Sequence, residues 1–360
     1  MLKSKTQKKK NSDSIFMAVF LLIFSLCIIP FIIQKYKQKD IPSKLTINRN
    51  ISTPAGPENL PSDVAQKPAI KFNYSDDLSI DQEKFQSEAV LLYDVDSKTI
   101  IYRKNSDKAL FPASTTKIMT ACIALKYLPQ DYKINVGSEI TMLAPDSSVA
   151  NLNQGNILTL EDALYALLLP SGNDAAYSIA VNTARYVSKN SMLSDSDSIK
   201  YFCNLMNQEA ESAGALHTHF CNPDGYHDVF HYTTAEDLLR ISILSRQYPL
   251  IAQIVATPSR DTNIISGQHY YWENGNCLVL SGNEYSVPYA NGLKTGFTDP
   301  AGYCMVATAS KDGKELIAVT MKSPSLSGRY TDAANLIYSV FEPEKMFADE
   351  KHEDEQPQPE

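Results

Sequence analysis

The stretch YCMVATASKDGKELIAVTMK, residues 303–322, decides the fold of this 360-residue chain. Its two halves, 303–309 and 315–322, are rich in the apolar and β-branched residues that form half-buried strands. Between them lies Lys311-Asp312-Gly313, and an Asp-Gly pair readily adopts the positive φ angles of a tight turn. The stretch is therefore predicted to be a β-hairpin.

A second hairpin is predicted much earlier in the chain. Ala89 to Val95 and Thr99 to Tyr102 have a similar composition, and the polar turn Asp96-Ser97-Lys98 joins them. Strands thus open and close the folded part of the sequence.

Helical patterns fill the sequence between the hairpins. Thr159-x-x-Asp162 and Thr233-x-x-Glu236 resemble capping boxes before apolar runs. Four apolar residues share one face of a further helix, which Gly214 is expected to end (Ile199, Phe202, Met206 and Ala210). Early and late strands meeting in one antiparallel sheet predict an α/β fold of the α+β kind. The sheet is flanked by helices in an α/β/α sandwich with a helical insert, and a doubly wound parallel sheet is disfavoured.

The N-terminal segment differs from the rest in charge and hydropathy. The net charge is −8, yet residues 1–39 hold eight lysines against Asp13, so the remainder sums to −15. Residues 15–33 are almost wholly apolar, and nineteen such residues cross a hydrocarbon core of about 30 Å. Flanking lysines argue against a buried core helix, and their excess before the span predicts a cytoplasmic N-terminus. No small-residue cleavage site ends the span, so an uncleaved anchor is favoured over a secreted, cleaved form.

The segments beside the folded body have compositions of their own. Residues 34–78 contain five prolines among polar residues and read as a linker. Residues 342–360 carry eight acidic residues and three prolines, which predicts a disordered, solvated tail. We therefore expect a basic tail at 1–14, a transmembrane anchor at 15–33, the linker, one folded domain at 79–341 and the acidic tail.

Five cysteines lie in the body without any C-x-x-C spacing (Cys122, Cys203, Cys221, Cys277 and Cys304). Their odd number leaves at least one unpaired within the chain. One or two disulfides, or a reducing habitat in which the thiols persist, are both compatible with the sequence.

Ser114 and Lys117 form an S-x-x-K motif at the start of a predicted helix, in PASTTK followed by an apolar run. Residues three apart lie on one helix face, so hydroxyl and amine become neighbours. A desolvated lysine can lose its proton near neutral pH and act as the base that a serine nucleophile needs. The alternative is an N-cap serine beside a solvated lysine.

Ser171 and Asn173 form an S-x-N element in LLLPSGNDAA, on a loop between two apolar helices. A hydroxyl placed there could relay a proton. The same tripeptide recurs at Ser281-Gly282-Asn283 before a predicted strand, and we interpret that second copy as an ordinary turn.

Lys294, Thr295 and Gly296 form a K-T-G element on a predicted strand, followed by Phe297. The strand offers a cation, a hydroxyl and a glycine that permits close backbone approach. An extended peptide with a carboxylate end can bind beside such a strand.

The three elements in this order resemble the serine D-alanyl-D-alanine carboxypeptidases, low-molecular-mass penicillin-binding proteins of the β-lactamase/transpeptidase-like superfamily. The surrounding phrases are similar as well, including GLKTGFTDPAG at 292–302 and THFCNPDG at 218–225. The resemblance covers about 250 residues and implies that the domain at 79–341 is catalytic. It implies an enzyme of peptidoglycan biosynthesis and cell shape that β-lactams inhibit and that needs no cofactor or metal.

The resemblance also implies the role of each residue. Ser114 would attack the penultimate D-alanine carbonyl, Lys117 would take its proton, and Ser171 would help deliver one to the departing D-alanine. Substrate-binding roles would fall to Asn173, Lys294, Thr295, Gly296, Phe297 and Arg329. Among these, the amide of Phe297 would share an oxyanion hole with that of Ser114, and Arg329 would assist carboxylate recognition.

Related and unrelated activities stay open as alternatives. A β-lactamase or a peptidoglycan endopeptidase shares the superfamily, although Gly172 stands where many β-lactamases have aspartate. A zinc peptidase is the alternative from another class, because four histidines cluster with acidic residues and a cysteine (His217, His219, His227 and His231). No H-E-x-x-H accompanies them.

The expected partners follow from charge and family resemblance. An acidic body without a basic stripe argues against nucleic acid. The expected partners are a stem peptide ending in D-Ala-D-Ala and the cytoplasmic membrane, with the catalytic domain outside that membrane.

Overall fold

The computed structural model describes residues 70–75 and 80–348. The predicted basic tail, the predicted span at 15–33, most of the linker and the end of the acidic tail lie outside these ranges. Within the ranges, no helix combines the length and the apolarity that crossing a membrane requires.

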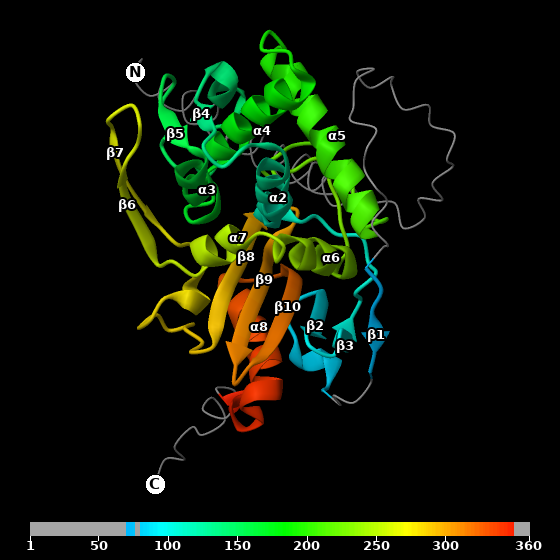
Figure 1. Cartoon of the computed structure of the whole chain (residues 1–360). Helices are drawn as coiled ribbons and strands as arrows, with labels where there is room; N and C mark the ends of the chain where they lie inside the picture. The colour runs from blue at the N-terminus through cyan, green and yellow to red at the C-terminus, as the bar shows by residue number, and fades with distance from the viewer. Residues whose placement is uncertain (1–69, 76–79, 349–360) are drawn as a thin grey trace, which may run out of the picture. The chain divides into compact units, whose positions relative to one another are not determined.

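A six-stranded sheet with the strand order β1-β3-β2-β10-β9-β8 forms the centre of the fold (Figure 1). All neighbours are antiparallel except the short edge strand β1, which runs parallel to β3. The strands are β1 (Asn73–Tyr74), β2 (Ala89–Asp94), β3 (Thr99–Lys104), β8 (Ala290–Thr298), β9 (Gly302–Lys311) and β10 (Lys314–Ser323). Because β2 pairs with β10, the early and late hairpins join in one sheet, as predicted.

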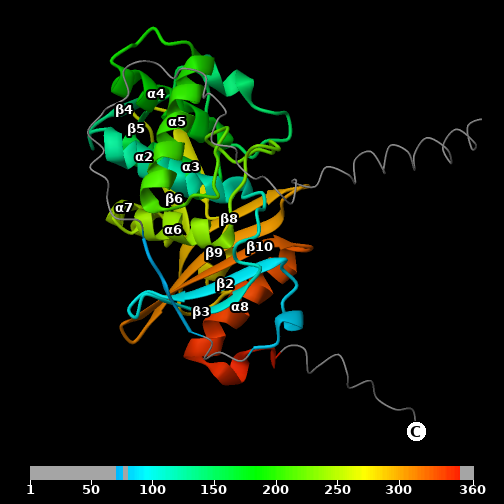
Figure 2. The ribbon, with the colours of Figure 1, turned by 90° about the vertical axis from the view of Figure 1, so that its right-hand side faces the viewer.

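Helices cover both faces of this sheet (Figure 2). On one face lies the predicted helical insert: α2 (Lys117–Tyr127), α3 (Leu160–Leu168), α4 (Asn173–Ser188), α5 (Asp195–Ala213), α6 (Ala235–Ser245) and α7 (Pro249–Val255). The other face is covered by α8 (Leu326–Phe341). The α/β/α architecture is thereby confirmed.

Strand β2 shows why two covering layers are needed. Leu91 and Tyr93 belong to the core under the helical insert, whereas Val90 and Leu92 belong to the core under α8. Successive side chains of a strand point to opposite faces, and here both faces are dry. Each fully buried side chain of this size contributes about 1.5–3 kcal/mol.

Smaller elements accompany the main sheet and its helices. Two hairpins lie outside the main sheet: β4 (Lys133–Asn135) with β5 (Ile157–Thr159), and β6 (Ser259–Asn263) with β7 (His269–Glu273). The described ranges also contain short 3₁₀ helices: η1 (Gln82–Lys84), η2 (Ala113–Thr116), η3 (Ser138–Met142), η4 (Cys277–Val279) and η5 (Pro343–Lys345).

The β6–β7 hairpin supports the loop that precedes β5. Trp272, the only tryptophan of the chain, is buried, and its indole N–H donates to the carbonyl of Ala150 at 3.0 Å. Tyr270 stacks on it and donates its hydroxyl to Asn156 Oδ1 at 2.6 Å. The loop from 150 to 156 is thus fixed from one side.

Helix termini agree with the predictions at α3 and α5 but differ at α6. Gly214 ends α5, as predicted. Thr159 caps α3 by accepting from the amide of Asp162 at 3.0 Å, as predicted. The prediction of Thr233 with Glu236 is wrong by one residue, because Thr234 accepts from the amide of Asp237 instead. Thr233 forms a β-bridge with Leu110, so the helix begins one position later.

The folded part extends beyond the predicted limits of 79 and 341. At the start, the ring of Phe72 lies 5.4 Å from that of Tyr93, inside the segment predicted as linker. At the end, the amide of Phe347 donates to Asn335 Oδ1 at 2.8 Å and its ring lies 5.6 Å from that of Phe85. The tail prediction missed this because one aromatic residue can anchor a short acidic segment.

All five body cysteines are free thiols in this structure, and Cys122, Cys203 and Cys304 are buried. Of the two states that the sequence left open, the structure therefore shows the reduced one.

The packing of residue 347 predicts a stability effect. Phe347→Ala should lower the free energy of unfolding by about 1–2 kcal/mol, because it removes a partly buried ring from the core under α8. Phe230→Ala is the control, since Phe230 is 65% exposed and its loss should cost under about 0.5 kcal/mol. Urea denaturation of both variants measures the difference, and equal values would contradict the extended boundary.

Candidate active site

The S-x-x-K, S-x-N and loop 222–226 segments meet at one amine. Lys117 is fully buried, and its Nζ donates to Ser114 Oγ at 2.9 Å, to Asn173 Oδ1 at 2.7 Å and to the carbonyl of Asp224 at 2.8 Å. Three bonds use all three hydrogens of an ammonium group. The structure therefore brings the predicted nucleophile and base together with Asn173.

Burial changes the acidity of this amine. Desolvation lowers the pKa of Lys117 to about 8, while the carboxylates of Asp224 and Asp174 oppose the shift. Two of its partners, the Asn173 and Asp224 oxygens, can only accept hydrogen bonds. The neutral amine must therefore give its two hydrogens to them, which leaves its lone pair facing Ser114 Oγ. That arrangement suits removal of the serine proton.

Ser114 lies in η2, the 3₁₀ turn before α2, and two glycines fix its surroundings. A Cβ on Gly225 would lie 1.9 Å from the carbonyl oxygen of Ala113, and its φ of +84° also favours glycine. A Cβ on Gly296 would lie 2.8 Å from the amide nitrogen of Ser114. The loop with Asp224 and strand β8 can therefore approach the nucleophile only because these residues lack a side chain.

Hydrogen bonds at the start of helix α4 fix the S-x-N loop. Asn173 begins α4, and its amide donates to the carbonyl of Ser148 at 2.8 Å. The neighbouring Asp174 is buried and accepts from the amides of Ala150 and Leu152, both at 2.8 Å. The carboxylate thus ties this loop to the segment that Trp272 supports.

Ser171 is less closely engaged than the sequence predicts. Its backbone has a φ of 62°, and within the described ranges its hydroxyl makes no hydrogen bond. Ser148 occupies the adjacent position instead, donating to the carbonyl of Ser171 at 2.8 Å and lining the cavity beside Ser114. Ser148 was not predicted, because an isolated loop serine has no distinguishing pattern.

Two further buried basic side chains lie beside the site: Lys294 on the K-T-G strand β8 and Arg329 on α8. Lys294 is 2% exposed, and burial, followed by the charges of Lys117 and Arg329, holds its pKa well below the ordinary value. Its Nζ donates to the carbonyl of Thr295 at 2.9 Å. Arg329 is also buried and donates to the carbonyl of Gly296 at 3.3 Å. No acidic side chain forms an ion pair with either cation among the described residues.

Aromatic rings enclose Arg329 and border the site. Its guanidinium lies 4.6 Å from the ring centroid of Tyr330 and 5.4 Å from that of Tyr303. Phe297 packs on the same Tyr303, with ring centroids 4.4 Å apart, yet is 47% exposed. The exposed face of Phe297 therefore borders the space in front of the nucleophile.

That space is a cavity of about 300 Å³. Ser114 and Asn173 line it, together with Asp146, Ser147, Ser148, Gly225, Tyr226, His227, Phe297, Thr298, Asp299 and Pro300. Its size suits the end of a peptide.

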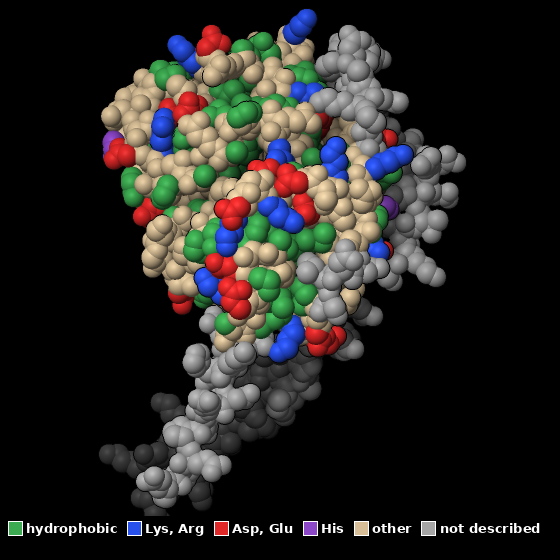
Figure 3. All heavy atoms as spheres, turned by 60° about the horizontal axis from the view of Figure 1, so that its bottom comes forward, with side chains coloured by type: hydrophobic (Ala, Val, Ile, Leu, Met, Phe, Trp, Pro, Cys, Tyr) green, Lys and Arg blue, Asp and Glu red, His purple; other side chains and the backbone are tan. Residues whose placement is uncertain are grey.

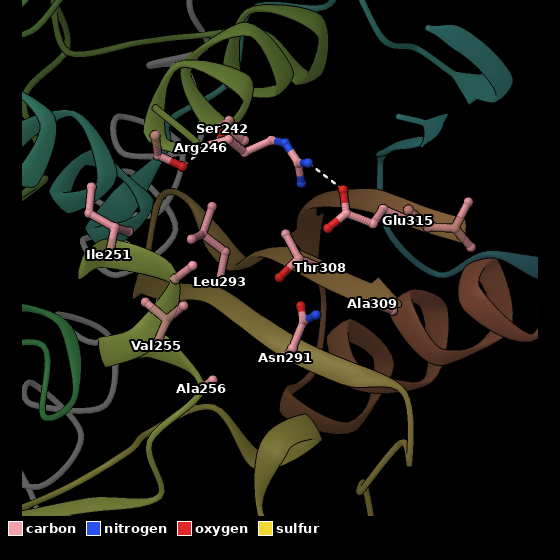
Figure 4. Close-up of a pocket in the computed structure, with 13 residues that line it drawn as sticks. Ser242, Arg246, Ile251, Val255, Ala256, Asn291, Leu293, Thr308, Ala309 and Glu315 are labelled. Atoms are coloured by element: carbon pink, nitrogen blue, oxygen red, sulfur yellow. Dashed lines mark hydrogen bonds and ion pairs between the residues drawn. The ribbon is translucent and has the colours of Figure 1, made fainter. Parts of the chain in front are cut away.

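A second cavity, of about 250 Å³, lies between α6, α7 and the first half of β8 (Figure 4). Leu293, Ile251 and Val255 line it, and an ion pair between Arg246 and Glu315 borders it. No residue of the three motifs contributes to this lining, whereas Ser114 and Asn173 line the first cavity.

The histidine cluster has structural contacts instead of a shared centre. His231 is buried, accepts from the amide of Cys221 at 3.1 Å and must therefore donate from Nε2 to Thr116 Oγ1 at 2.8 Å. Burial lowers its pKa to about 3. Among the described residues no three histidine, cysteine or acidic side chains converge as metal ligands. The zinc-peptidase alternative therefore lacks a site of the expected geometry.

Comparison with known proteins identifies the family. Residues 76–325 match the family described as D-alanyl-D-alanine carboxypeptidase. The carboxypeptidase of Streptomyces sp. strain K15 is 32% identical over 248 residues, which cover 66% of this chain and 81% of that protein. The D-alanyl-D-alanine endopeptidase of Escherichia coli is 30% identical over 71% of this chain and 77% of its own length. Against DacF of Bacillus subtilis, at 26% identity, 71% of this chain matches but only 62% of the relative.

Solved structures agree with this assignment. The Streptomyces K15 DD-transpeptidase superposes with a TM-score of 0.66 at 29% identity, covering 73% of this chain and 99% of that one. Penicillin-binding protein D2 of Listeria monocytogenes, solved in its ampicillin-bound form, gives 0.58 at 25% identity and covers 72% and 98%. With the family match spanning most of the described domain, this chain belongs to the D-alanyl-D-alanine carboxypeptidase family of serine peptidases.

Proposed function

We propose that this enzyme removes the terminal D-alanine from peptidoglycan stem peptides through an acyl-enzyme on Ser114. The observation that carries the proposal is the buried Lys117 amine, hydrogen-bonded to Ser114 Oγ and to two oxygens that only accept. This is the arrangement that a serine nucleophile needs from a neighbouring base.

The first step forms the acyl-enzyme. Ser114 Oγ bonds to the penultimate D-alanine carbonyl carbon while its proton passes to Lys117. The negative charge that develops on the carbonyl oxygen is held by the amides of Ser114 and Phe297. The tetrahedral intermediate then breaks its C–N bond, and the departing D-alanine amine takes up a proton delivered with the help of Ser171.

The second step hydrolyses the acyl-enzyme and regenerates the free enzyme. Water attacks the ester carbonyl, gives its proton back through Lys117, and the C–O bond to Ser114 breaks. The shortened peptide leaves with a new carboxylate. An amine in place of water would give transpeptidation, and the relatives carry both carboxypeptidase and endopeptidase names.

The terminal carboxylate of the substrate is assigned to the K-T-G strand. Lys294 and Thr295 would bind it, and Arg329 would hold the strand through the carbonyl of Gly296. In support, Lys294 and Arg329 are buried, and among the described residues neither forms an ion pair with an acidic side chain, so an anion beside the strand would compensate their charge. Asn173 would orient the substrate backbone.

The proposed substrate and the sequence both support a catalytic domain outside the cytoplasmic membrane. Peptidoglycan lies outside that membrane, and residues 15–33 have the length and apolarity of a span with lysines before it. On the face seen in Figure 3, positive and negative side chains are interspersed without a continuous basic stripe, which does not favour nucleic acid. We therefore propose a single-pass anchor with the catalytic domain outside.

Acylation by benzylpenicillin tests the nucleophile. The chain should gain the mass of one penicilloyl group, and Ser114→Ala should abolish the gain because, among the described residues, Ser114 Oγ is the one hydroxyl that is hydrogen-bonded to Lys117. Ser281→Ala, in the second S-G-N copy, is the matched control and should acylate as the parent does. Intact-mass spectrometry with peptide mapping gives the result. An adduct that Ser114→Ala retains would refute the proposed nucleophile, and rapid loss of the adduct would favour the β-lactamase alternative.

The pKa of Lys117 predicts how acylation depends on pH. The base must be deprotonated to accept the proton, and its pKa lies at about 8. The acylation rate should therefore rise about tenfold per pH unit below 8 and level off above it. Lys117→Arg should lose this limb together with most of the rate, since arginine keeps its proton. A rate independent of pH between 6 and 9 would contradict Lys117 as the base.

Membrane extraction tests the anchor. The full chain should stay with membranes washed in alkaline carbonate, whereas a chain lacking residues 1–39 should become soluble, because the apolar span supplies the retention. A chain lacking 349–360 is the control and should remain bound. Recovery of the protein from the medium, with its N-terminus trimmed after the span, would favour the secreted form.

A further inference from the structure

We propose that His231 is a positioning residue for acylation. Its imidazole holds Thr116, and through Thr116 the turn that carries Ser114 and Lys117, against residues 219–231, named here the histidine loop. The inference rests on the proposed function and adds to it a buried residue outside the lining of the cavity.

Two of the bonds between the histidine loop and the S-x-x-K segment use backbone carbonyls. Lys117 Nζ donates to the carbonyl of Asp224 at 2.8 Å. Thr120, about one turn further along α2, donates its hydroxyl to the carbonyl of Pro223 at 2.5 Å. Every residue has a carbonyl, so these two bonds depend on where the loop lies and not on its side chains.

His231 supplies a bond that does depend on a side chain. Its ring is buried, and Nδ1 accepts from the amide of Cys221 at 3.1 Å. The hydrogen of the neutral ring is therefore on Nε2, which lies 2.8 Å from Thr116 Oγ1. Thr116 is buried as well and directly precedes Lys117. The imidazole thus joins the start of the histidine loop to the turn that carries the nucleophile.

The backbone of the histidine loop also packs closely against the same hydroxyl. A Cβ on Gly225 would lie 2.8 Å from Thr116 Oγ1. Loss of the bond to His231 would let the loop and the turn shift relative to each other. The bond from Lys117 to the carbonyl of Asp224 would shift with them, and with it the aim of the amine at Ser114 Oγ.

The imidazole must be neutral for this role. Both nitrogens of a protonated ring donate, and the amide of Cys221 is itself a donor. Burial lowers the pKa of His231, and the charges of His219, His227 and Lys117 act in the same direction. The two bonds therefore persist throughout the pH range in which acylation is measured.

Two substitutions separate the roles of the two ring nitrogens. In His231→Gln the side-chain amide reaches the place of Nε2 and can still donate to Thr116 Oγ1. In His231→Asn the side chain ends near the place of Nδ1, so it can accept from the amide of Cys221 but does not reach Thr116. Both variants remove a ring from a buried site and should lose similar amounts of stability in urea.

Acylation by benzylpenicillin, followed by intact mass, distinguishes the two variants. Its dependence on penicillin concentration gives the rate constant of acylation and the apparent dissociation constant. His231→Asn should lower the rate constant about tenfold, because a misplacement of about 1 Å between reacting groups can cost about 100-fold. The dissociation constant should stay within about twofold, since the cavity lining is unchanged. His231→Gln should keep the rate constant within about threefold, since its bond to Thr116 remains.

Thr116→Val tests the same bond from the acceptor side, because valine nearly keeps the shape of threonine without its hydroxyl. Alone it should lower the rate constant about tenfold, and adding His231→Asn should lower it little further, since both changes remove one interaction. His219→Asn is the matched control. His219 is exposed, and its Nδ1 bonds the carbonyl of Phe230 at 2.7 Å within the same loop. This variant should acylate as the parent does.

Three results would overturn the inference: equal rate constants in His231→Asn and His231→Gln, rate losses that multiply in the double variant, or an equal loss in His219→Asn. If His231→Asn does not fold, Thr116→Val decides alone, and a parental rate constant would refute the role of the bond. Failure of the proposed function looks different, because the parent enzyme would then form no adduct on Ser114, and the inference would fall with it.

Discussion

The burial of one amine constrains the rest of the structure. An ammonium group transferred from water into a protein interior costs several kcal/mol unless its hydrogens are satisfied. At Lys117, four segments supply what is needed: η2 carries Ser114, α4 begins at Asn173, the loop at Asp224 offers a carbonyl, and β8 closes the space behind. Each can reach the amine only if the sheet and the helical insert hold their positions.

This arrangement trades stability for reactivity. The pKa of Lys117 is lower in the folded chain than the ordinary value of 10.5, so the unfolded chain binds the proton more readily between about pH 8 and 10.5. The contribution of this group to stability therefore rises with pH across that window and is unfavourable below it. Burial of Lys294 acts in the same direction. Two dry cores, one on each face of the sheet, offset these costs.

Much of this could be predicted from the sequence where local patterns decide the structure. The strand pattern and Asp-Gly turn located the β9–β10 hairpin, and S-x-x-K placed a hydroxyl beside an amine. The carbonyl of Asp224 could not be predicted as a partner of Lys117, because every residue has a carbonyl. The register at Thr234 and the packing of Phe347 depend on tertiary neighbours. Such contacts have no signature in the local sequence.

The hydrogen bonds that support the S-x-N loop include one from a residue that fluoresces. Trp272 is the only indole in the chain, and it donates to the carbonyl of Ala150, whose amide in turn binds Asp174 beside Asn173. Tryptophan emission responds to the polarity and hydrogen bonding of the indole. The tryptophan fluorescence of the unmodified protein therefore originates from one residue, two hydrogen bonds away from the helix start that carries Asn173. The enzyme contains its own optical reporter of that loop, and ligand entry could be followed in real time without a label.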